Sequence, residues 1–238
     1  MAEALRGRRR PRRLLIADGV RDDARIRDLA ARANELGLPI ERPPRPLLDD
    51  LTGGANHQGV ALDAGPYPFV ALDDVLGAPG TLLVLDHLND PQNFGTLLRA
   101  ADAAGVAGVV VPQDRAAGVT PAVVNASAGA VEHLRLAQVP NLVRAVELMK
   151  ERGWWIVALE AAPEALDLFA ADLPSPVALV VGAEGDGIGP LLRRRCDMLV
   201  SLPMRGQVAS LNAATAGAIA LFELLRRESV AATPEREP

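Results

Sequence analysis

Short apolar runs recur along the chain of 238 residues and are densest after residue 80. These runs are rich in valine and leucine, and few polar positions interrupt them. They predict five strands: Leu82–Leu85, Val109–Val111, Trp154–Leu159, Val177–Val181 and Met198–Leu202. Strands that are apolar on both faces are typical of a parallel sheet covered by helices on both sides.

Between these runs, apolar residues recur at helical spacing. The pattern predicts helices at Asn93–Ala104, Thr120–Ala126, Asn141–Arg152 and Ser210–Arg226. Strands that alternate with helices predict the α/β fold class with a mostly parallel sheet. Ligands bind such sheets beyond the carboxyl ends of the strands, so the residues that follow each strand are the first candidates for chemistry.

A smaller block at the start of the chain has its own alternation. It predicts strands at Arg13–Ala17, Leu38–Arg42 and Val60–Leu62, and helices at Asp22–Leu36 and Leu47–Leu51. Glycine and proline at 65, 66 and 68 then have the composition of a linker. We therefore expect a small α/β domain over 1–64, a linker over 65–79, a larger domain over 80–228 and a flexible tail over 229–238.

Composition excludes several classes of protein. Hydrophobic residues make up 49% and charged residues 23%, so the chain is expected to fold. With one cysteine and three scattered histidines, it is expected to hold no disulfide and no metal. No apolar stretch follows the N-terminal arginines, and 211–225 is too short and too polar to span a bilayer. We therefore expect a cytoplasmic protein without membrane contact.

The charge is unevenly distributed. The formal net charge is −5, yet residues 1–13 contain six arginines and one acid. Arginines gathered at one end can hold the phosphates of a nucleic acid, and a solvated, partly disordered tail is the alternative. Arg8, Arg9 and Arg10 are candidate RNA contacts, as is Arg193 in the run 193–195, with a solvated charge run as the alternative for each cluster.

Common nucleotide and hydrolase motifs do not occur in the sequence. It contains neither GxxxxGKS nor GxxxxGKT, and Ser127 lacks the first glycine of a GxSxG turn. Glycines at 185, 187 and 189 give a GxGxG pattern, which Rossmann-type methyltransferases place after their first strand. Here the pattern follows roughly the fourth strand, which argues against that class.

Three segments that follow predicted strands combine polar residues with glycine. In the first, 85–99, Asn93 and Gly95 are expected to cap a helix and to expose backbone amides. Arg99 follows six residues after Asn93. It is either a surface residue paired with Asp102 or part of a site.

The second and third segments are 182–189 and 201–212. The second holds four glycines, which let the backbone approach a ligand closely, and its Glu184 is either a solvated or an orienting carboxylate. In the third, Ser210 is the expected N-cap of the last helix. Asn212 would then lie two residues into that helix, where no strong structural reason requires asparagine, so we expect it at a site.

Together these segments resemble the three motifs of the SpoU family of RNA ribose 2′-O-methyltransferases, within the SPOUT superfamily. The matching sequences are NFGTLLR at 93–99, VVGAEGDGIG at 180–189 and LVSLPMRGQVASLNAATAGAIALFE at 199–223. The resemblance extends over about residues 80–226. It implies a C-terminal trefoil knot formed by roughly 177–226, and a homodimer through the catalytic domain.

The first block is similar to the small L30-like RNA-binding domain of one branch of the family, which methylates a guanosine ribose in 23S ribosomal RNA. The end of that domain carries a sequence like Asn56–Gly59. Residues 1–5 match a helix that a short strand normally precedes, so either the start of the sequence is misassigned or the domain lacks this edge strand and is shortened at its N-terminus. The implied partner is 23S ribosomal RNA or a pre-ribosomal particle, with His57 and Gln58 as candidate RNA contacts.

The implied activity is methyl transfer from S-adenosylmethionine (AdoMet) to a ribose 2′-hydroxyl. By resemblance the catalytic residues are Arg99, Asn93, Glu184, Ser210 and Asn212, and the cofactor-binding residues are Gly182, Leu202 and Leu211. The family treats the arginine as catalytic, sometimes as a general base. Guanidinium groups keep their proton near neutral pH, so we favour a clamp on the phosphate beside the target ribose.

Other functions fit part of the same pattern. A transfer-RNA methyltransferase or a ribosome-modifying resistance enzyme would use the same chemistry. A ribosome-binding assembly protein without catalysis is the alternative from a different class. The joint presence of Asn93, Arg99, Glu184 and Asn212 argues against it, because a pure binder has no need of all four.

Overall fold

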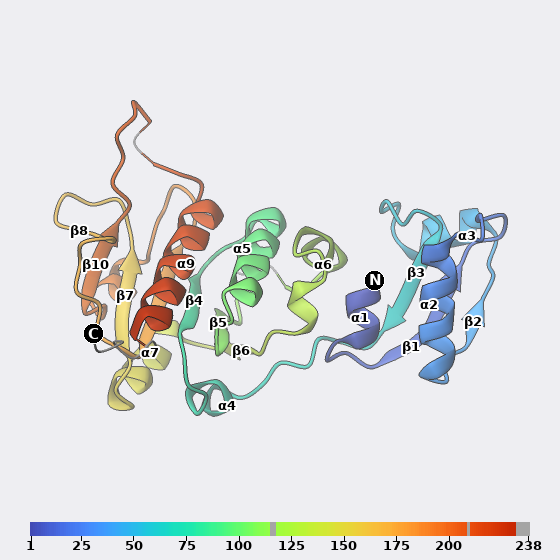
Figure 1. Ribbon diagram of the computed structural model, residues 1–238, viewed down its shortest axis with the longest axis horizontal. Helices are drawn as coiled ribbons and strands as arrows, with labels where there is room; N and C mark the ends of the chain where they lie inside the picture. Colours follow the sequence, from blue (N-terminus) through green and yellow to red (C-terminus); the bar gives the residue numbers. More distant parts are fainter. Residues whose placement is uncertain (115–117, 209, 232–238) are drawn as a thin grey trace, which may run out of the picture. The chain divides into compact units, whose positions relative to one another are not determined.

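The computed structural model describes residues 1–114, 118–208 and 210–231 (Figure 1). The chain divides into two compact units, Met1–Pro68 (unit 1) and Phe69–Pro238 (unit 2). Each described unit has its own buried core.

Unit 1 is a small α/β unit with a three-stranded sheet. Its elements are α1 (Ala2–Arg6), β1 (Pro11–Ile16), α2 (Ala24–Glu35), β2 (Ile40–Glu41), α3 (Arg45–Leu51) and β3 (Val60–Ala64). The sheet has the order β2-β1-β3, with β1 parallel to β2 and antiparallel to β3. Asp23 caps α2 by accepting a hydrogen bond from the Ile26 amide at 2.9 Å, and the apolar face of α2 covers the sheet.

Unit 2 contains a seven-stranded parallel sheet. Its elements are α4 (Leu72–Leu76), β4 (Leu82–Asp86), α5 (Pro91–Ala103), β5 (Gly108–Pro112), α6 (Pro121–Ala126), the 3-10 turn η1 (Ala130–Glu132), β6 (Leu136–Val139), α7 (Leu142–Glu151), β7 (Trp155–Leu159), β8 (Leu166–Asp167), β9 (Val177–Gly182), α8 (Pro190–Arg193), β10 (Met198–Ser201) and α9 (Ala213–Ala231). The strand order is β6-β5-β4-β9-β7-β10-β8, and every pairing is parallel. The predicted α/β class with a mostly parallel sheet is confirmed.

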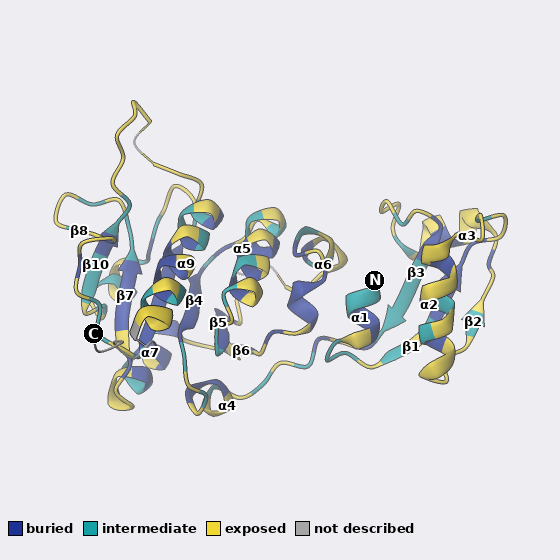
Figure 2. Ribbon diagram, viewed as in Figure 1, coloured by how far each residue is buried: buried dark blue, intermediate teal, exposed yellow. Residues whose placement is uncertain are grey.

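Helices lie on both faces of this sheet (Figures 1 and 2). On one face, residues of α4, α7 and α8 share a core with alternate residues of the central strands. On the other face α9 packs against α5 and β9. An added Cβ at Gly217 would lie 2.8 Å from a Leu97 methyl group and 3.3 Å from one of Val181. The central strands β4, β5 and β9 are buried along their whole length, as their apolar runs predict.

The strand order brings segments that are distant in sequence to one edge of the sheet. Strand β9 lies between β4 and β7, although β4 comes almost a hundred residues earlier in the chain. The carboxyl ends of these strands therefore lie side by side at a point where the strand order reverses. Ligands bind parallel α/β sheets at such points.

Several predicted boundaries differ from the structure. Helix α4 falls within the range 65–79 assigned to the linker, and its Val75 and Leu76 are buried in the core of unit 2. Strand β6 was not predicted, because the exposed Gln138 interrupts its apolar run. Strand β8 was also missed, since its two residues are exposed at the sheet edge.

The sequence predicted that Asn93 caps the helix of the first motif segment and that Gly95 exposes backbone amides there, and both predictions are wrong. Asp90, and not Asn93, caps α5, since its carboxylate accepts hydrogen bonds from the amides of residues 92 and 93 at 3.2 Å. Pro91 suits the first helical position, which the prediction overlooked. Gly95 is buried in α5, and an added Cβ would lie 2.4 Å from the Cβ of Ala126. It therefore permits close packing of α5 on α6 and exposes no amide.

Within the described ranges, no helix has the length and apolar character needed to cross a membrane.

Candidate functional site

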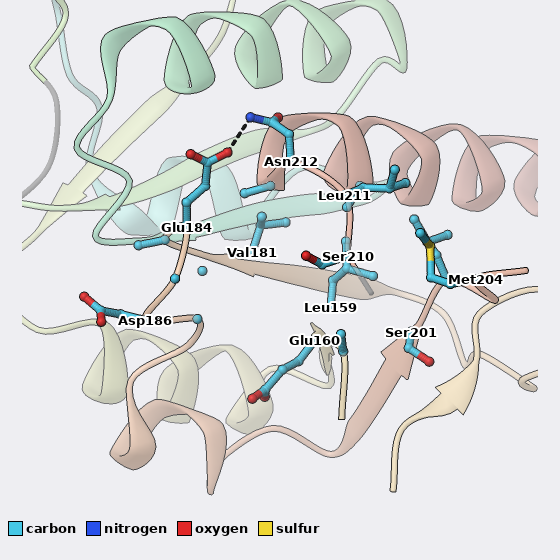
Figure 3. Close-up of a pocket in the computed structure, with 18 residues that line it drawn as sticks. Leu159, Glu160, Val181, Glu184, Asp186, Ser201, Met204, Ser210, Leu211 and Asn212 are labelled. Carbon is cyan, nitrogen blue, oxygen red and sulfur yellow. Dashed lines mark hydrogen bonds between the residues drawn. The ribbon is translucent and has the colours of Figure 1, made fainter. Parts of the chain in front are cut away.

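A cavity of about 530 Å³ lies beyond the carboxyl ends of β7, β9 and β10 (Figure 3). Its walls come from four segments, 159–161, 181–187, 201–204 and 210–216. The first three segments follow strands of the parallel sheet, and the fourth leads into α9. The volume is within the usual range for a small-molecule site.

The glycine-rich segment after β9 forms one wall and folds back on itself. The amide of Ala183 donates to the carbonyl oxygen of Gly187 at 3.1 Å, and the Gly187 amide donates back at 3.0 Å. Gly187 thereby lies so close to Gly182 that an added Cβ at Gly182 would meet its carbonyl at 2.3 Å. Gly185 and Gly187 have φ values of 82° and 65°, which glycine adopts without strain. The glycines therefore fix the loop that carries Glu184.

Asn212 joins all three motif segments. Its side-chain oxygen accepts hydrogen bonds from the amides of Ala214 at 2.9 Å and Thr215 at 3.1 Å, so Asn212 is the N-cap of α9. Its Nδ2 donates to Oδ1 of Asn93 at 2.8 Å and to Glu184 (Figure 3 draws the Glu184 contact). The prediction that Ser210 caps this helix is wrong. The expectation that no structural reason requires asparagine at position 212 is also wrong, because Asn212 is the cap.

Among the described residues, the charged ones that line the cavity are all acidic: Glu160, Glu184 and Asp186. Glu160 accepts a hydrogen bond from Nε of Arg193 at 2.7 Å, and the same guanidinium binds Glu164. The hydrogen bond from Arg193 lowers the pKa of Glu164. The rim on this side is therefore held by an ion-paired cluster, and the lining favours a ligand with positive charge.

The predicted cofactor-binding residues and most of the predicted catalytic residues meet at this cavity. Gly182, Leu202 and Leu211 line it, as do Glu184, Ser210 and Asn212. Asn93 lies outside the lining and reaches it through Asn212. Arg99 is exposed on α5 and does not line the cavity. Within the described residues its side chain forms no ion pair and no hydrogen bond, so the suggested pair with Asp102 does not form.

The loop that carries His57 and Gln58 belongs to unit 1. The His57 side chain is only 5% exposed, because its Nδ1 accepts from the Gly59 amide at 2.9 Å and its Nε2 lies 2.6 Å from Oδ1 of Asp49. Gln58 is exposed, with a φ of 49°, and accepts a hydrogen bond from Arg25. His57 therefore supports its loop, whereas Gln58 lies at the surface.

The predicted N-terminal RNA contacts differ in their surroundings. The guanidinium carbon of Arg9 lies 5.9 Å from the centre of the Tyr67 ring. Arg8 is half-buried and Arg10 is exposed. The fourth candidate, Arg193, is engaged by the two carboxylates described above. Arg10 is thus the most accessible of the four.

Two acidic residues of the cavity, Glu160 and Asp186, were not predicted from the sequence, and neither were several apolar residues of its lining, such as Leu159 and Met204. Glu160 directly follows β7, so the rule that pointed to the strand ends would also have found it. No signal in the sequence distinguishes Asp186 from an ordinary loop carboxylate.

Comparisons with known proteins identify the family of this chain. Residues 80–222 match the family described as the SpoU rRNA Methylase family. The chain belongs to the SpoU rRNA methylase family. Residues 2–70 also match a family described as RNA 2′-O ribose methyltransferase substrate binding, which covers unit 1.

Similar curated proteins include other methyltransferases. The 23S rRNA (guanosine-2′-O-)-methyltransferase RlmB of Pseudomonas syringae pv. tomato is 40% identical over 95% of this chain and 92% of its own length. An uncharacterized tRNA/rRNA methyltransferase of Synechocystis is 39% identical over 94% of this chain, which spans only 60% of that protein.

Solved structures of SpoU-type enzymes share the fold. The AdoMet-bound rRNA methyltransferase from Sinorhizobium meliloti has a TM-score of 0.79 and 26% identity, covering 95% of this chain and 84% of its own. The SpoU methyltransferase AviRb from Streptomyces viridochromogenes, in complex with AdoMet, has a TM-score of 0.78 and 27% identity, covering 96% and 87%.

AdoMet is the cofactor of the SpoU family, and the cavity fits it. The closely packed Gly182 leaves backbone groups at the wall where a side chain would intrude. The acidic lining suits a sulfonium cation, which is the charged centre of this cofactor. Among the described residues, no group of three or more His, Cys, Asp or Glu side chains could hold a metal ion.

Proposed function

We propose that this protein transfers the methyl group of AdoMet to a ribose 2′-hydroxyl of ribosomal RNA, and that the target is a guanosine of 23S rRNA. The observation that carries the proposal is the Asn93–Asn212–Glu184 hydrogen-bonded cluster, which joins the three motif segments beside the cavity. The names of the RlmB relatives from P. syringae and Vibrio vulnificus support a guanosine of 23S rRNA as the target.

Bound AdoMet supplies a methyl group that its positive sulfur already activates. The tasks left to the chain are to align the ribose hydroxyl, to accept its proton and to exclude water. We assign cofactor binding to Gly182, Leu202 and Leu211, which line the cavity. We assign orientation of the ribose to Asn93, Glu184 and Asn212, which hydrogen bonds join beside the cavity, and to Ser210, which lines it.

Arg99 is assigned to the phosphate beside the target ribose. Its guanidinium is exposed on α5 and uncommitted to any carboxylate of the described residues, so its charge is available to an incoming phosphate. It would also stabilise the alkoxide that develops as the hydroxyl loses its proton.

The test is tritium transfer from labelled AdoMet to deproteinised ribosomal and transfer RNA. We expect wild type to label ribosomal RNA as a 2′-O-methyl nucleoside. Loss of a preorganised charge at the reaction centre lowers turnover by about a hundredfold or more, and we expect this for Arg99→Ala. The AdoMet dissociation constant of this variant is expected to be unchanged in a calorimetric titration.

Arg144→Ala, on the exposed face of α7, serves as the matched control and should transfer label normally. Near-normal turnover by Arg99→Ala would refute the role of this arginine. Labelled transfer RNA in place of ribosomal RNA would assign the other substrate class. Absence of AdoMet binding by wild type would favour a non-catalytic RNA-binding protein.

RNA capture is assigned to unit 1, which matches the substrate-binding family over residues 2–70. We place the reaction in the cytoplasm, because the similar 23S rRNA methyltransferases come from bacteria, whose ribosomal RNA lies there. We also propose a homodimer through unit 2, supported by the exposed Ile219 and Phe222 on α9. Light scattering should then give twice the chain mass of 25.1 kDa, and the mass of a single chain would contradict the dimer.

A further inference from the structure

Asp86 is a buried carboxylate at the end of β4 that the chemistry above does not use. Its side chain is 4% exposed. One oxygen, Oδ2, accepts a hydrogen bond from the backbone amide of Gly189 at 2.7 Å. The other, Oδ1, is bound by Nδ1 of His87. Both carboxylate oxygens are therefore engaged, one of them by a residue 103 positions later in the sequence.

The two contacts place Asp86 at the base of the glycine-rich wall of the cavity. In the sheet register, Asp86 lies opposite Gly182, where the wall begins. Through its side chain it holds Gly189, the last glycine of the same segment. Asp86 thus contacts both ends of the loop that carries Glu184, while it does not line the cavity itself.

The surrounding backbone is adapted to this contact. His87 has a φ of 56°, which is uncommon for a residue other than glycine and aims its ring back at the preceding carboxylate. Gly189 has little room for a side chain, since an added Cβ would lie 3.2 Å from Oδ2 of Asp86. The positive φ of His87 and the absence of a side chain at Gly189 thus both accompany the contacts of the Asp86 carboxylate.

We infer that Asp86 is a positioning residue of the AdoMet site, which closes the base of the 182–189 loop and thereby holds Glu184 against Asn212. The inference concerns cofactor binding, and it can be tested without any RNA substrate. If the protein proves not to methylate RNA, a calorimetric titration with AdoMet still decides it.

The experiment compares Asp86→Ala with Asp86→Asn. The alanine variant leaves the Gly189 amide without its acceptor, and we expect the AdoMet dissociation constant to rise at least tenfold. The asparagine variant keeps an oxygen for Gly189 and offers its NH₂ to the ring nitrogen of His87, so affinity should stay within threefold of wild type. Hydrogen exchange of the peptide 182–190 should quicken in the alanine variant alone.

Val84→Ala is the control for general loss of stability. Val84 is fully buried in the same strand, where it packs with the core shared by α4 and α7. This variant should lower the melting temperature and leave AdoMet affinity unchanged. If Asp86→Ala does not fold, Gly189→Ala replaces it, because the added methyl group pushes against the carboxylate and should weaken AdoMet binding severalfold.

Three results would overturn the inference. The first is an AdoMet dissociation constant for Asp86→Ala, or for Gly189→Ala in its place, within twofold of wild type. The second is an equal loss of affinity in Val84→Ala, which would make the effect one of stability. The third is an AdoMet affinity of folded Asp86→Asn as low as that of Asp86→Ala. The side-chain oxygen that accepts from Gly189 would then not be what holds the 182–189 loop.

Discussion

Asn212 combines a structural and a functional task in one side chain. Its oxygen caps α9, and its nitrogen donates to Asn93 and Glu184. An amide is suited to this position because it carries an acceptor and a donor on one rigid plane. A carboxylate would cap the helix equally well, but it would repel Glu184.

The two tasks of Asn212 can be separated by substitution. Asn212→Ser keeps an oxygen that can cap α9 and removes the donor to Asn93 and Glu184, so the unfolding free energy should change by less than about 0.5 kcal/mol. Asn212→Ala removes both and should lose about 1 kcal/mol. Urea denaturation checks stability, and tritium transfer checks activity, which we expect to fall at least tenfold in both variants. Full activity in Asn212→Ser would show that the cap alone matters.

Individual residues also mark how far the sequence could predict this site. Glu184 and Asn212 were identified because three motif segments match a family in order and spacing. The cap was assigned to Ser210 because serine is a common N-cap, and only the hydrogen bonds to the amides of 214 and 215 place the helix start two residues later. The role of Arg99 stays a prediction, since no contact among the described residues constrains its guanidinium.

At the scale of elements, helix α9 is held to the chain after β8 by Arg227, whose guanidinium is oriented by Glu223 of the same helix. Glu223 is 7% exposed and accepts hydrogen bonds from Arg226 and from Arg227, the latter at 2.7 Å. Arg227 in turn donates to the backbone carbonyl oxygens of Leu168 at 2.7 Å and Ala171 at 2.6 Å. The acid thus orients an arginine that holds a neighbouring turn.

This ion pair makes part of the stability depend on pH. The hydrogen bonds from Arg226 lower the pKa of Glu223 from its usual value of 4.5 to about 2; burial opposes this shift, and the hydrogen bond from Arg227 adds to it. A carboxylate whose pKa is lowered by folding contributes stability above its unfolded pKa. The contribution is lost as the pH falls from about 4.5 towards 2.

Glu223→Gln should therefore lower the unfolding free energy at pH 7 by about 1–2 kcal/mol, because neutral hydrogen bonds replace charge-assisted ones. The difference in unfolding free energy between this variant and wild type should become smaller below pH 4. Denaturant titrations between pH 3 and 7 measure both effects. Glu151→Gln, at the exposed end of α7, is the control and should leave stability unchanged at every pH. A constant difference across this range would contradict the titration of Glu223.

Elements were predicted where the pattern is strong and missed where it is weak. Strands β4 and β9 were found because every one of their residues is buried and apolar runs mark them. Strand β8 has two exposed residues and takes its strand form from pairing with β10, which no local pattern reports. The trefoil knot implied for 177–226 stays a prediction, because it depends on how the chain threads and not on any periodicity.

For the whole molecule, charge and chemistry are divided between the two units. Unit 1 carries twelve arginines against ten acids, for a net charge of +2, and the rest of the chain then carries −7. Within the described ranges, the cavity of unit 2 is lined by three carboxylates and by no basic residue. A polyanion is therefore attracted to unit 1 and repelled at the cavity, whereas a cationic cofactor is attracted there. This division favours separate sites for RNA capture and for methyl transfer.

The division predicts where the salt dependence of RNA binding arises. Each phosphate that an arginine neutralises releases counterions, so RNA affinity should fall steeply with salt. If Arg8 and Arg10 each contact one phosphate, the double variant Arg8→Gln/Arg10→Gln should reduce the slope of log affinity against log salt by about 1.5. Filter binding to 23S ribosomal RNA at several salt concentrations measures that slope. Arg135→Gln, an exposed site on unit 2, should leave it unchanged. An unaltered slope in the double variant would mean that this N-terminal charge is only solvated and that other arginines of the chain hold the RNA.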